Sequence, residues 1–566
     1  MIKRWSVKDI PGEAHIAELS KALNINRYLT SILIQRGISD FESARHYFRP
    51  SLEALINPFE MKGMEAAVVR LHQAVTTREN ILVFGDYDVD GTTSVALVSS
   101  YIRRFYACEV YIPDRNIEGY GISKAGIDWA ESNHCSLIVA LDCGIKSIAL
   151  VAYAKAKGID FIICDHHLPD DNVPDAVAVL DPKQKDCPYP YKELSGCGIG
   201  FKLMQAYAQR YRDPSEVLDY LDLVAVSIAS DVVPLTGENR ILAFYGLRKL
   251  NTNPVPGLKA LKGIADLRTE LDVSGIMFSL GPRINAAGRI AHGSAAVALL
   301  NAHSEEDALA LANTLNLRNE ERKEFDHSIT GEAIAMIEGS DTLRSAKSTV
   351  LFKNTWHKGV IGIVAARCVE KYYRPTVILT ESNNKVTGSA RSVNGFDLYS
   401  AILECSDLLE KFGGHKYAAG LTLDISNLES FQQKFEQVVS STITEEMLTP
   451  LVEMDVSIPF DIITPKFMSI LKQMSPFGPE NPKPVFEANN VYVFNSLSLF
   501  KDRHIKFIAG QHNSNHVFQA VGFDLSEHYA KLGESNRFRM AFTLEENVYN
   551  GVTSIQLRIK DIKFDA

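Results

Sequence analysis

The chain has 566 residues, of which 46% are hydrophobic and 23% are charged, and its formal net charge is −10 at pH 7. This length exceeds what one hydrophobic core holds, so we expect three or four globular domains. The sequence has no apolar run of about 18 residues and no apolar signal segment after its start, which argues against a membrane protein and favours the cytoplasm. The eight cysteines lack C-x-x-C spacing, so we expect free thiols rather than disulfides or a zinc site.

From residue 60 to residue 230, short apolar runs alternate with amphipathic stretches. The runs at 81–84, 137–141, 161–163 and 176–180 are typical of buried parallel strands. Helix-like segments, such as 93–105 and 147–157, lie between them. This alternation predicts an α/β domain with a parallel sheet and right-handed crossovers.

The sequence pattern changes in the second half of the chain. Residues 304–339 are charged and favour helix, so we expect one or two linking helices there. A smaller α/β pattern follows, with strands at 349–352 and 376–379 around a helix at 359–371.

After residue 450 the pattern becomes all-β. We expect strands at 490–500 and 504–509 and a hairpin turn at Asn550-Gly551, which together favour a C-terminal β-barrel of OB-like type. We interpret segment 477–482 as a turn-rich linker.

Acidic and histidine side chains follow three successive predicted strands and one apolar helix-like run. They are Asp86, Asp88, Asp90, Asp142, Asp165, His166, His167 and Asp231. Because ligands bind outside the carboxyl ends of parallel strands, these groups should converge at one edge of the sheet. Carboxylates so close together raise each other's pKa unless a cation lies among them. Carboxylates with imidazole suit Mg²⁺ or Mn²⁺, and there are enough ligands for two such ions.

Each part of this pattern has a simpler interpretation. The Asp-x-Asp-x-Asp-Gly loop also suits a calcium-like turn or a solvated loop, and an Asp after a strand often caps the next helix. A histidine pair is more often on the surface than catalytic. The hypothesis of a metal site depends on the three strand ends taken together.

Longer motifs resemble the DHH phosphoesterase superfamily and, within it, the RecJ-type exonucleases. The matching segments are 85–91, 165–167, 230–235, 281–289, 356–365, 388–392 and 412–420, and the resemblance runs from about Trp5 to the C-terminus. It implies a 5′-to-3′ exonuclease that hydrolyses single-stranded DNA to mononucleotides with two divalent cations, Mn²⁺ or Mg²⁺, in DNA repair and recombination.

The resemblance also implies a domain plan. We expect an N-terminal segment at 1–55, a DHH phosphoesterase domain at 56–302 and linking helices at 303–345. A DHH-associated nucleic-acid-binding domain at 346–448 and an OB-like domain at 449–566 complete the plan.

Residue roles follow from the same resemblance. Asp88, Asp90, Asp142, His166 and Asp231 match the family's metal ligands. Asp86 is either a further ligand or a support for one. His167 matches a residue that contacts the scissile phosphate, and we expect Asp165 to orient a histidine.

A second set of residues fits contact with the DNA strand. They are Arg283, Asn285, His357, Ser389, Arg391 and His415. A hydroxyl, a guanidinium and backbone donors in the motif 388–391 suit the terminal 5′-phosphate, although a tight turn with a surface arginine would have the same sequence. Residues 346–392 contain eight Lys or Arg and two Glu, a balance of +6 (8 minus 2), which favours binding.

Two other functions remain open. One is a pyrophosphatase, or a phosphatase of short oligonucleotides or nucleoside bisphosphates, in the same superfamily. The other is a non-catalytic single-strand-binding or replisome scaffold. Single-stranded DNA is the expected partner, and the resemblance adds a single-strand-binding protein and recombination helicases. We expect a monomer. The sequence does not choose between Mn²⁺ and Mg²⁺ and does not exclude RNA.

Overall fold

The computed structural model describes residues 2–115, 117–267, 269–290, 292–549 and 551–564. The chain divides into two compact units. The motif unit, named for its Asp165-His166-His167 triplet, comprises Ile38–Glu320 and Gln473–Lys483. The terminal unit comprises Met1–Gly37, Glu321–Lys472 and Pro484–Ala566.

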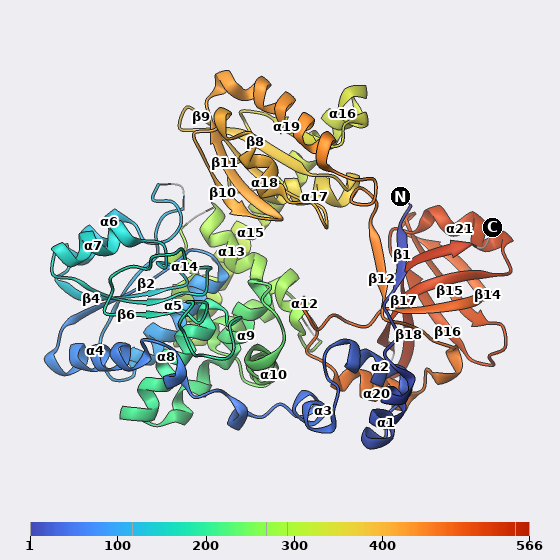
Figure 1. The fold of residues 1–566 in the computed structure, drawn as a ribbon, viewed down its shortest axis with the longest axis horizontal. Helices are drawn as coiled ribbons and strands as arrows, with labels where there is room; N and C mark the ends of the chain where they lie inside the picture. The colour runs from blue at the N-terminus through green and yellow to red at the C-terminus, as the bar shows by residue number, and fades with distance from the viewer. Residues whose placement is uncertain (1, 116, 268, 291, 550, 565–566) are drawn as a thin grey trace. The chain divides into compact units, whose positions relative to one another are not determined.

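The centre of the motif unit is a five-stranded sheet in which every neighbouring pair of strands is parallel (Figure 1). In spatial order the strands are β3 (Glu109–Tyr111), β2 (Asn80–Gly85), β4 (Cys135–Leu141), β5 (Asp160–Cys164) and β6 (Ala178–Leu180). The predicted parallel α/β sheet is therefore confirmed. Strand β3 was not predicted, because three partly exposed residues give no apolar run.

Alternate residues of these strands enter two different cores. Val83 and Val139 pack in one core with the helices α5 (Val89–Arg103), α8 (Gly196–Tyr211) and α9 (Leu221–Ser230). Phe84 and Ala140 pack in the other core with α6 (Lys124–Ser132) and α7 (Ile148–Ala156). Helices therefore cover both faces of the sheet, so only its edges and strand ends remain available for a site.

The linking region is a single helix, α15 (Glu305–Glu338), followed by the short α16 (Asp341–Ser345). The terminal unit then contains a five-stranded sheet with a predicted α/β pattern. Its strands in spatial order are β10 (Lys411–His415), β11 (Ala418–Leu423), β9 (Lys385–Arg391), β8 (Thr376–Ser382) and β7 (Thr349–Phe352). Helices α17 (Ile361–Tyr372) and α19 (Leu428–Thr442) accompany this sheet.

The last part of the chain forms a six-stranded sheet that closes on itself. Its strands are β13 (Val456–Ser457), β14 (Phe486–Phe500), β15 (His504–Gln511), β16 (Val517–Gly522), β18 (Val552–Phe564) and β17 (Phe538–Tyr549). An additional pairing of β14 with β17 closes the ring, which fits the predicted OB-like domain. Asn550 of the predicted turn lies outside the described residues, but Tyr549 and Val552 on either side pair as a hairpin.

Two parts of the chain lie where the sequence did not predict them. Strand β1 (Arg4–Val7) pairs in parallel with β12 (Leu451–Met454), which lies far along the chain. Segment 477–482, interpreted as a linker, belongs to the motif unit. Its glycine and proline residues indicated turns, but they carried no information about what those turns pack against.

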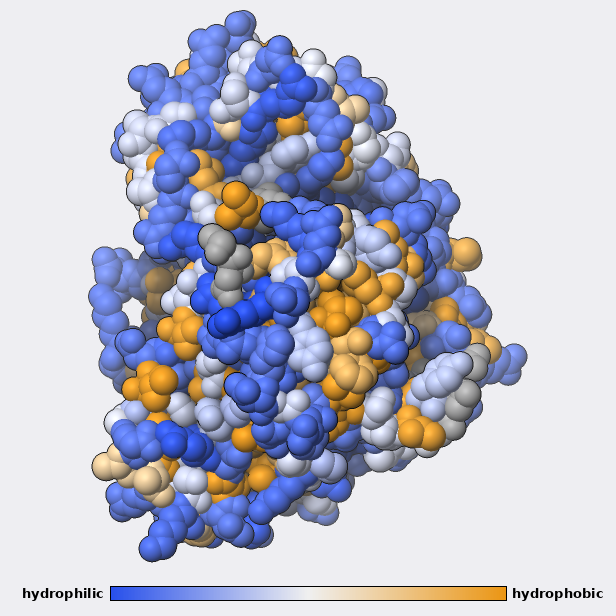
Figure 2. Space-filling view, turned by 90° about the vertical axis from the view of Figure 1, so that its right-hand side faces the viewer, coloured by the Kyte–Doolittle hydropathy of each residue, from blue (hydrophilic) through white to orange (hydrophobic). Residues whose placement is uncertain are grey.

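The surface is of mixed polarity. On the face drawn in Figure 2, hydrophilic residues predominate and apolar residues form separate groups. Among the described residues, no helix is both long and apolar enough to cross a membrane. All eight cysteines are buried and carry free thiols.

Candidate metal centre

The imidazole of His166 lies among three carboxylates that come from different parts of the motif unit. Its Nε2 atom is 3.3 Å from Oδ1 of Asp142, 3.5 Å from Oδ2 of Asp231 and 3.7 Å from Oδ2 of Asp90. Among the described residues, two groups have metal-like spacing: Asp142 with His166 and His167, and Asp90 with His166 and Asp231. The fold therefore brings Asp90, Asp142, His166 and Asp231 together, as the sequence predicted.

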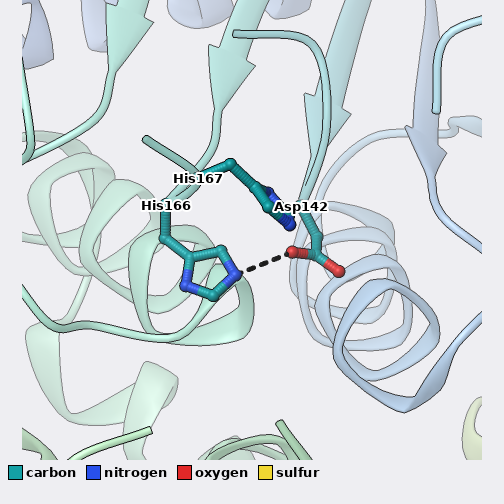
Figure 3. A group of neighbouring side chains, drawn as sticks. All are labelled: Asp142, His166 and His167. Atoms are coloured by element: carbon teal, nitrogen blue, oxygen red, sulfur yellow. Dashed lines mark ion pairs between the residues drawn. The ribbon is translucent and has the colours of Figure 1, made fainter. Parts of the chain in front are cut away.

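Figure 3 shows Asp142, His166 and His167 directed toward one another from neighbouring strand ends. Asp142 follows β4 in a left-handed conformation with φ of 58°, and its N–H donates to the carbonyl of Cys164 at 2.8 Å. Gly196 lies against this carboxylate, since a Cβ there would be 2.7 Å from Oδ1 of Asp142. The site therefore needs glycine at the start of α8.

Asp90 is buried and held by three donors. Its Oδ2 accepts the N–H of Gly196 at 2.7 Å, and its Oδ1 accepts the N–H of Cys197 at 2.8 Å and the hydroxyl of Ser227 at 2.6 Å. The first two donors belong to the N-terminal turn of α8, where backbone N–H groups favour an anion. These bonds fix the direction of the carboxylate within the site.

The other two carboxylates of the 85–91 motif take different roles. Asp88 is the N-cap of α5, and its Oδ1 accepts the N–H of Gly91 at 3.0 Å. Asp86 is fully buried and accepts the N–H of Gly121 at 3.3 Å. Neither joins the two groups with metal-like spacing among the described residues, so their assignment as ligands stays a prediction.

Burial raises the pKa of three carboxyl groups of this site, those of Asp86, Asp231 and Asp142. Burial, and then the charge of Asp88, raises the pKa of Asp86 to about 8. Burial, and then the charges of Asp90 and Asp88, raises the pKa of Asp231 to about 8. The pKa of Asp142 is well above its ordinary value, with burial as the main cause. A divalent cation would oppose this effect, because it stabilises the ionised form.

Asp165 does not face the three-carboxylate group but holds His167. Its Oδ1 lies 2.7 Å from Nδ1 of His167, and its Oδ2 accepts the N–H of Ile145 at 2.9 Å. Burial acts to lower the pKa of His167, but this hydrogen bond and the neighbouring carboxylates outweigh it and raise the pKa to about 9. Nδ1 of His166, by contrast, is buried without a hydrogen-bond partner among the described residues. Burial lowers the pKa of this ring, which suits a neutral ligand imidazole.

Sequence reasoning missed Tyr120. Its hydroxyl lies 3.0 Å from Nε2 of His167 and donates to the carbonyl of Asp142 at 3.3 Å. It also missed Ser227 and Gly196, which support Asp90 and Asp142. A tyrosine in a loop and a serine within an apolar helix carry no sequence signal of such contacts.

The predicted DNA contacts of the motif unit lie on α13 (Gly281–Ile290). This helix approaches the 85–91 motif, since a Cβ at Gly288 would be 2.7 Å from the carbonyl oxygen of Tyr87. Arg283 donates to Oδ1 of Asn316 at 2.9 Å and to the carbonyl of Ser279 at 2.7 Å. Asn285 is partly buried on the same helix.

In the terminal unit, two rows of residues cross the sheet from β9 to β10. One row is Ser389, Gly420 and Gly413, and the other is Arg391, Ala418 and His415. The residues between the polar ones are small, so backbone is accessible along both rows. Ser389 and Arg391 also meet at the first turn of α17, because a Cβ at Gly362 would lie 3.1 Å from Oγ of Ser389 and 3.0 Å from Nη2 of Arg391.

His357 is engaged with its own neighbours. Its ring stacks on Phe325 with centroids 5.1 Å apart, and its Nδ1 accepts the N–H of Gly359 at 3.1 Å.

Ion pairs offset much of the positive balance of residues 346–392. Five of its eight basic side chains form ion pairs with carboxylates that all lie outside the segment. These pairs are Lys347–Glu445, Lys353–Glu332, Arg367–Asp326, Lys371–Glu338 and Lys385–Glu410. Arg374 is buried and donates to backbone carbonyls. The segment's charge is therefore a poor argument for DNA binding.

Comparisons with known proteins agree with this arrangement of domains. Family models match the N-terminal domain of the DHH family at residues 80–228, the DHHA1 domain at 345–441 and the RecJ OB domain at 454–561. The single-stranded-DNA-specific exonuclease RecJ of Bacillus subtilis (strain 168) is 35% identical over 99% of this chain and 70% of its own length. The chain belongs to the RecJ family.

Other RecJ proteins match over most of their length. The enzyme of Salmonella typhimurium is 33% identical over 94% of this chain and 95% of its own. The crystal structure of RecJ from Thermus thermophilus in complex with Mn²⁺ has a TM-score of 0.85 and 26% identity, and the match covers 100% of this chain and 80% of that one. A RecJ structure bound to manganese has a TM-score of 0.60 and 30% identity, covering 70% of this chain and 98% of that one.

Proposed function

We propose that this chain is a metal-dependent exonuclease that hydrolyses single-stranded DNA from its 5′ end to mononucleotides, in DNA repair and recombination. The observation that carries the proposal is the position of Nε2 of His166, which has the carboxylates of Asp142, Asp231 and Asp90 at 3.3 to 3.7 Å. The curated relatives in the RecJ family are named single-stranded-DNA-specific exonucleases.

The donor set fits two divalent cations, Mn²⁺ or Mg²⁺. The proposed ligands are Asp88, Asp90, Asp142, His166 and Asp231, with Asp86 as a further ligand or a support. Oδ1 of Asp142 and Oδ2 of Asp86 are buried and have no hydrogen-bond partner among the described residues. Carboxylates with one neutral imidazole suit these ions. When bound, such cations lower the pKa of a water molecule and stabilise the charge that develops on the phosphate.

The protein side chains perform the remaining tasks. The hydrogen bond and charge of Asp165 raise the pKa of His167 against the effect of burial, and so favour the protonated ring. A protonated ring would bring a positive charge and an N–H donor to the scissile phosphate. Asp165 orients this ring through Nδ1. The donors from α8 and Ser227 keep Asp90 in one orientation without substrate.

End recognition is assigned to the terminal unit. We propose that Ser389 and Arg391 bind the terminal 5′-phosphate, supported by their meeting at the first turn of α17. His415 ends the row that starts at Arg391, where it would contact the next part of the strand. Arg283, Asn285 and His357 are proposed to face the phosphate backbone.

Further parts of the proposal rest on the family resemblance. They are a single-strand-binding protein and recombination helicases as partners, a monomeric state and a cytoplasmic location. The domain boundaries 1–55, 56–302, 303–345, 346–448 and 449–566 are proposed on the same basis.

Digestion of end-labelled DNA tests the proposal. We expect release of mononucleotides from single strands but not from duplex, in the presence of Mn²⁺ or Mg²⁺ and not with chelator. Asp142→Ala is expected to abolish hydrolysis while DNA binding remains measurable. Unchanged hydrolysis by Asp142→Ala would contradict the site, and activity on very short oligonucleotides alone would favour the phosphatase alternative.

A further inference from the structure

A short segment between two elements of the terminal unit is built into the motif unit. This segment, Met474–Pro482, which we call the strap, lies between α20 (Pro465–Gln473) and β14. Within it, Gly478 and Asn481 form an antiparallel bridge, and the side chain of Asn481 is buried. A flexible linker would have neither feature, so the strap has a defined conformation.

The strap is held by polar contacts that are buried or partly buried. Arg240 of α10 (Gly237–Thr252) donates to the carbonyls of Ser475 at 2.9 Å and Pro476 at 3.3 Å. Asn481 donates to the carbonyl of Pro476 at 2.7 Å and accepts the hydroxyl of Tyr47 at 2.8 Å. Breaking one such contact leaves buried polar groups without partners, so releasing the strap from the motif unit costs free energy.

The strap contacts the loop that carries Asp231. The N–H of Leu235 donates to the carbonyl of Pro479 at 2.9 Å. Gly478 packs on the same leucine, since a Cβ at this glycine would lie 2.4 Å from Cδ1 of Leu235. Leu235 is 1% exposed, so its side chain has little room to move away.

The loop between Asp231 and Leu235 is strained. Val232 has a φ of 61°, a left-handed conformation that is rare for a β-branched residue. Such a conformation persists only where the surroundings fix it. One end of the loop is fixed because the N–H of Asp231 donates to the carbonyl of Ser227 in α9. The other end is fixed at Leu235, whose N–H donates to the strap.

We propose that the strap is a positioning element for the Asp231 carboxylate, with Gly478 and Pro479 as the residues that act on Leu235. It keeps the strained loop in the conformation that brings Oδ2 of Asp231 to 3.5 Å from Nε2 of His166. This inference rests on the proposed function, because it takes Asp231 as a metal ligand.

Gly478→Ala tests the inference with one added methyl group. We expect the dissociation constant for Mn²⁺, measured by titration calorimetry, to rise about tenfold or more, as for other residues that orient metal ligands. Gly263→Ala is the matched control, because a Cβ there meets nothing within 4 Å, and its Mn²⁺ affinity should equal that of the wild type. Leu235→Val, added to Gly478→Ala, removes the colliding Cδ1 and should restore most of the affinity.

The outcomes separate the inference from the function on which it rests. Failure of the wild type to bind Mn²⁺ would overturn both. Wild-type affinity in folded Gly478→Ala, with tight binding by the wild type, would overturn the strap alone. If Gly478→Ala does not fold, the hydrogen exchange of the Leu235 amide is measured in the wild type with and without Mn²⁺. Slower exchange with Mn²⁺ supports the positioning role of the strap, and unchanged exchange overturns it.

Discussion

Oδ1 of Asp165 lies 2.7 Å from Nδ1 of His167 and accepts the backbone N–H groups of His166 at 2.8 Å and His167 at 3.1 Å. One carboxylate oxygen therefore sets both the ring of His167 and the backbone of the two histidines. Because Nδ1 of His167 is engaged by Asp165, Nε2 is the ring nitrogen left for the site, and the hydroxyl of Tyr120 lies 3.0 Å from it. The triplet is a single structural unit, in which Asp165 sets the orientation of the His167 ring and the backbone of both histidines.

Asp165→Asn should lower the pKa of His167 from about 9 toward the ordinary histidine value, because the amide removes the negative charge beside Nδ1. We expect kcat to fall by about 10- to 100-fold, as is common when such supporting carboxylates are replaced. NMR titration of the histidine resonances gives the pKa. His167→Ala identifies the resonance, and an unshifted His167 in Asp165→Asn would show that Asp165 does not govern it.

Gly196→Ala and Gly198→Ala form a matched pair in the first turns of α8. A Cβ at 196 would lie 2.7 Å from Oδ1 of Asp142, whereas one at 198 would have ordinary contacts at 3.4 Å or more. We expect Gly196→Ala to lose at least about 90% of its activity and to bind Mn²⁺ weakly, because Asp142 must move. Gly198→Ala should stay near wild-type activity. Equal activity of the two variants, measured on single-stranded DNA, would contradict the placement of Asp142.

The metal-free protein should become less stable as pH rises from about 4 to about 8. Asp86 and Asp231, with pKa values raised to about 8, keep protons in the folded state that the unfolded chain releases near pH 4. Mn²⁺ must displace these protons, so its affinity should increase with pH over the upper part of this range. Thermal unfolding in chelator measures the first effect. Asp231→Asn should show a shallower loss of Tm with pH, and an identical slope would argue against a raised pKa of Asp231.

Arg391→Gln should reduce the preference for a 5′-phosphorylated end. Loss of a charge-assisted contact of about 1.5 to 3 kcal/mol corresponds to roughly 10- to 100-fold in kcat/KM for the phosphorylated substrate. The rate on a 5′-hydroxyl substrate should change much less. Lys353→Gln is a suitable control, because this lysine of the same domain pairs with Glu332 and is not proposed to bind DNA. Equal losses on both substrates would show that Arg391 does not select the end.

The parallel sheet and the convergence of Asp90, Asp142, His166 and Asp231 could be predicted because each signal is local. An apolar strand followed by an acid is visible in the sequence, and parallel topology brings such ends together. The family resemblance supplied the division into domains and the role of His167. Residue spacing alone would have left the calcium-like turn and the capped helix as alternatives.

The parts that could not be predicted depend on contacts between distant residues. The hydroxyl of Tyr120 reaches His167 across 47 positions, and the N–H of Leu235 donates to the carbonyl of Pro479, which is far away in the sequence. Charge was misleading for a related reason. The basic residues of 346–392 were counted without their carboxylate partners, such as Asp326 for Arg367 and Glu338 for Lys371.

The most direct test of the metal centre is the location of Mn²⁺ by its anomalous scattering in crystals grown with this ion. The structure predicts a strong peak bounded by Nε2 of His166 and the carboxylates of Asp90, Asp142 and Asp231, which is lost in Asp142→Ala. A well-ordered crystal with these side chains in place and Mn²⁺ bound only elsewhere would contradict the account.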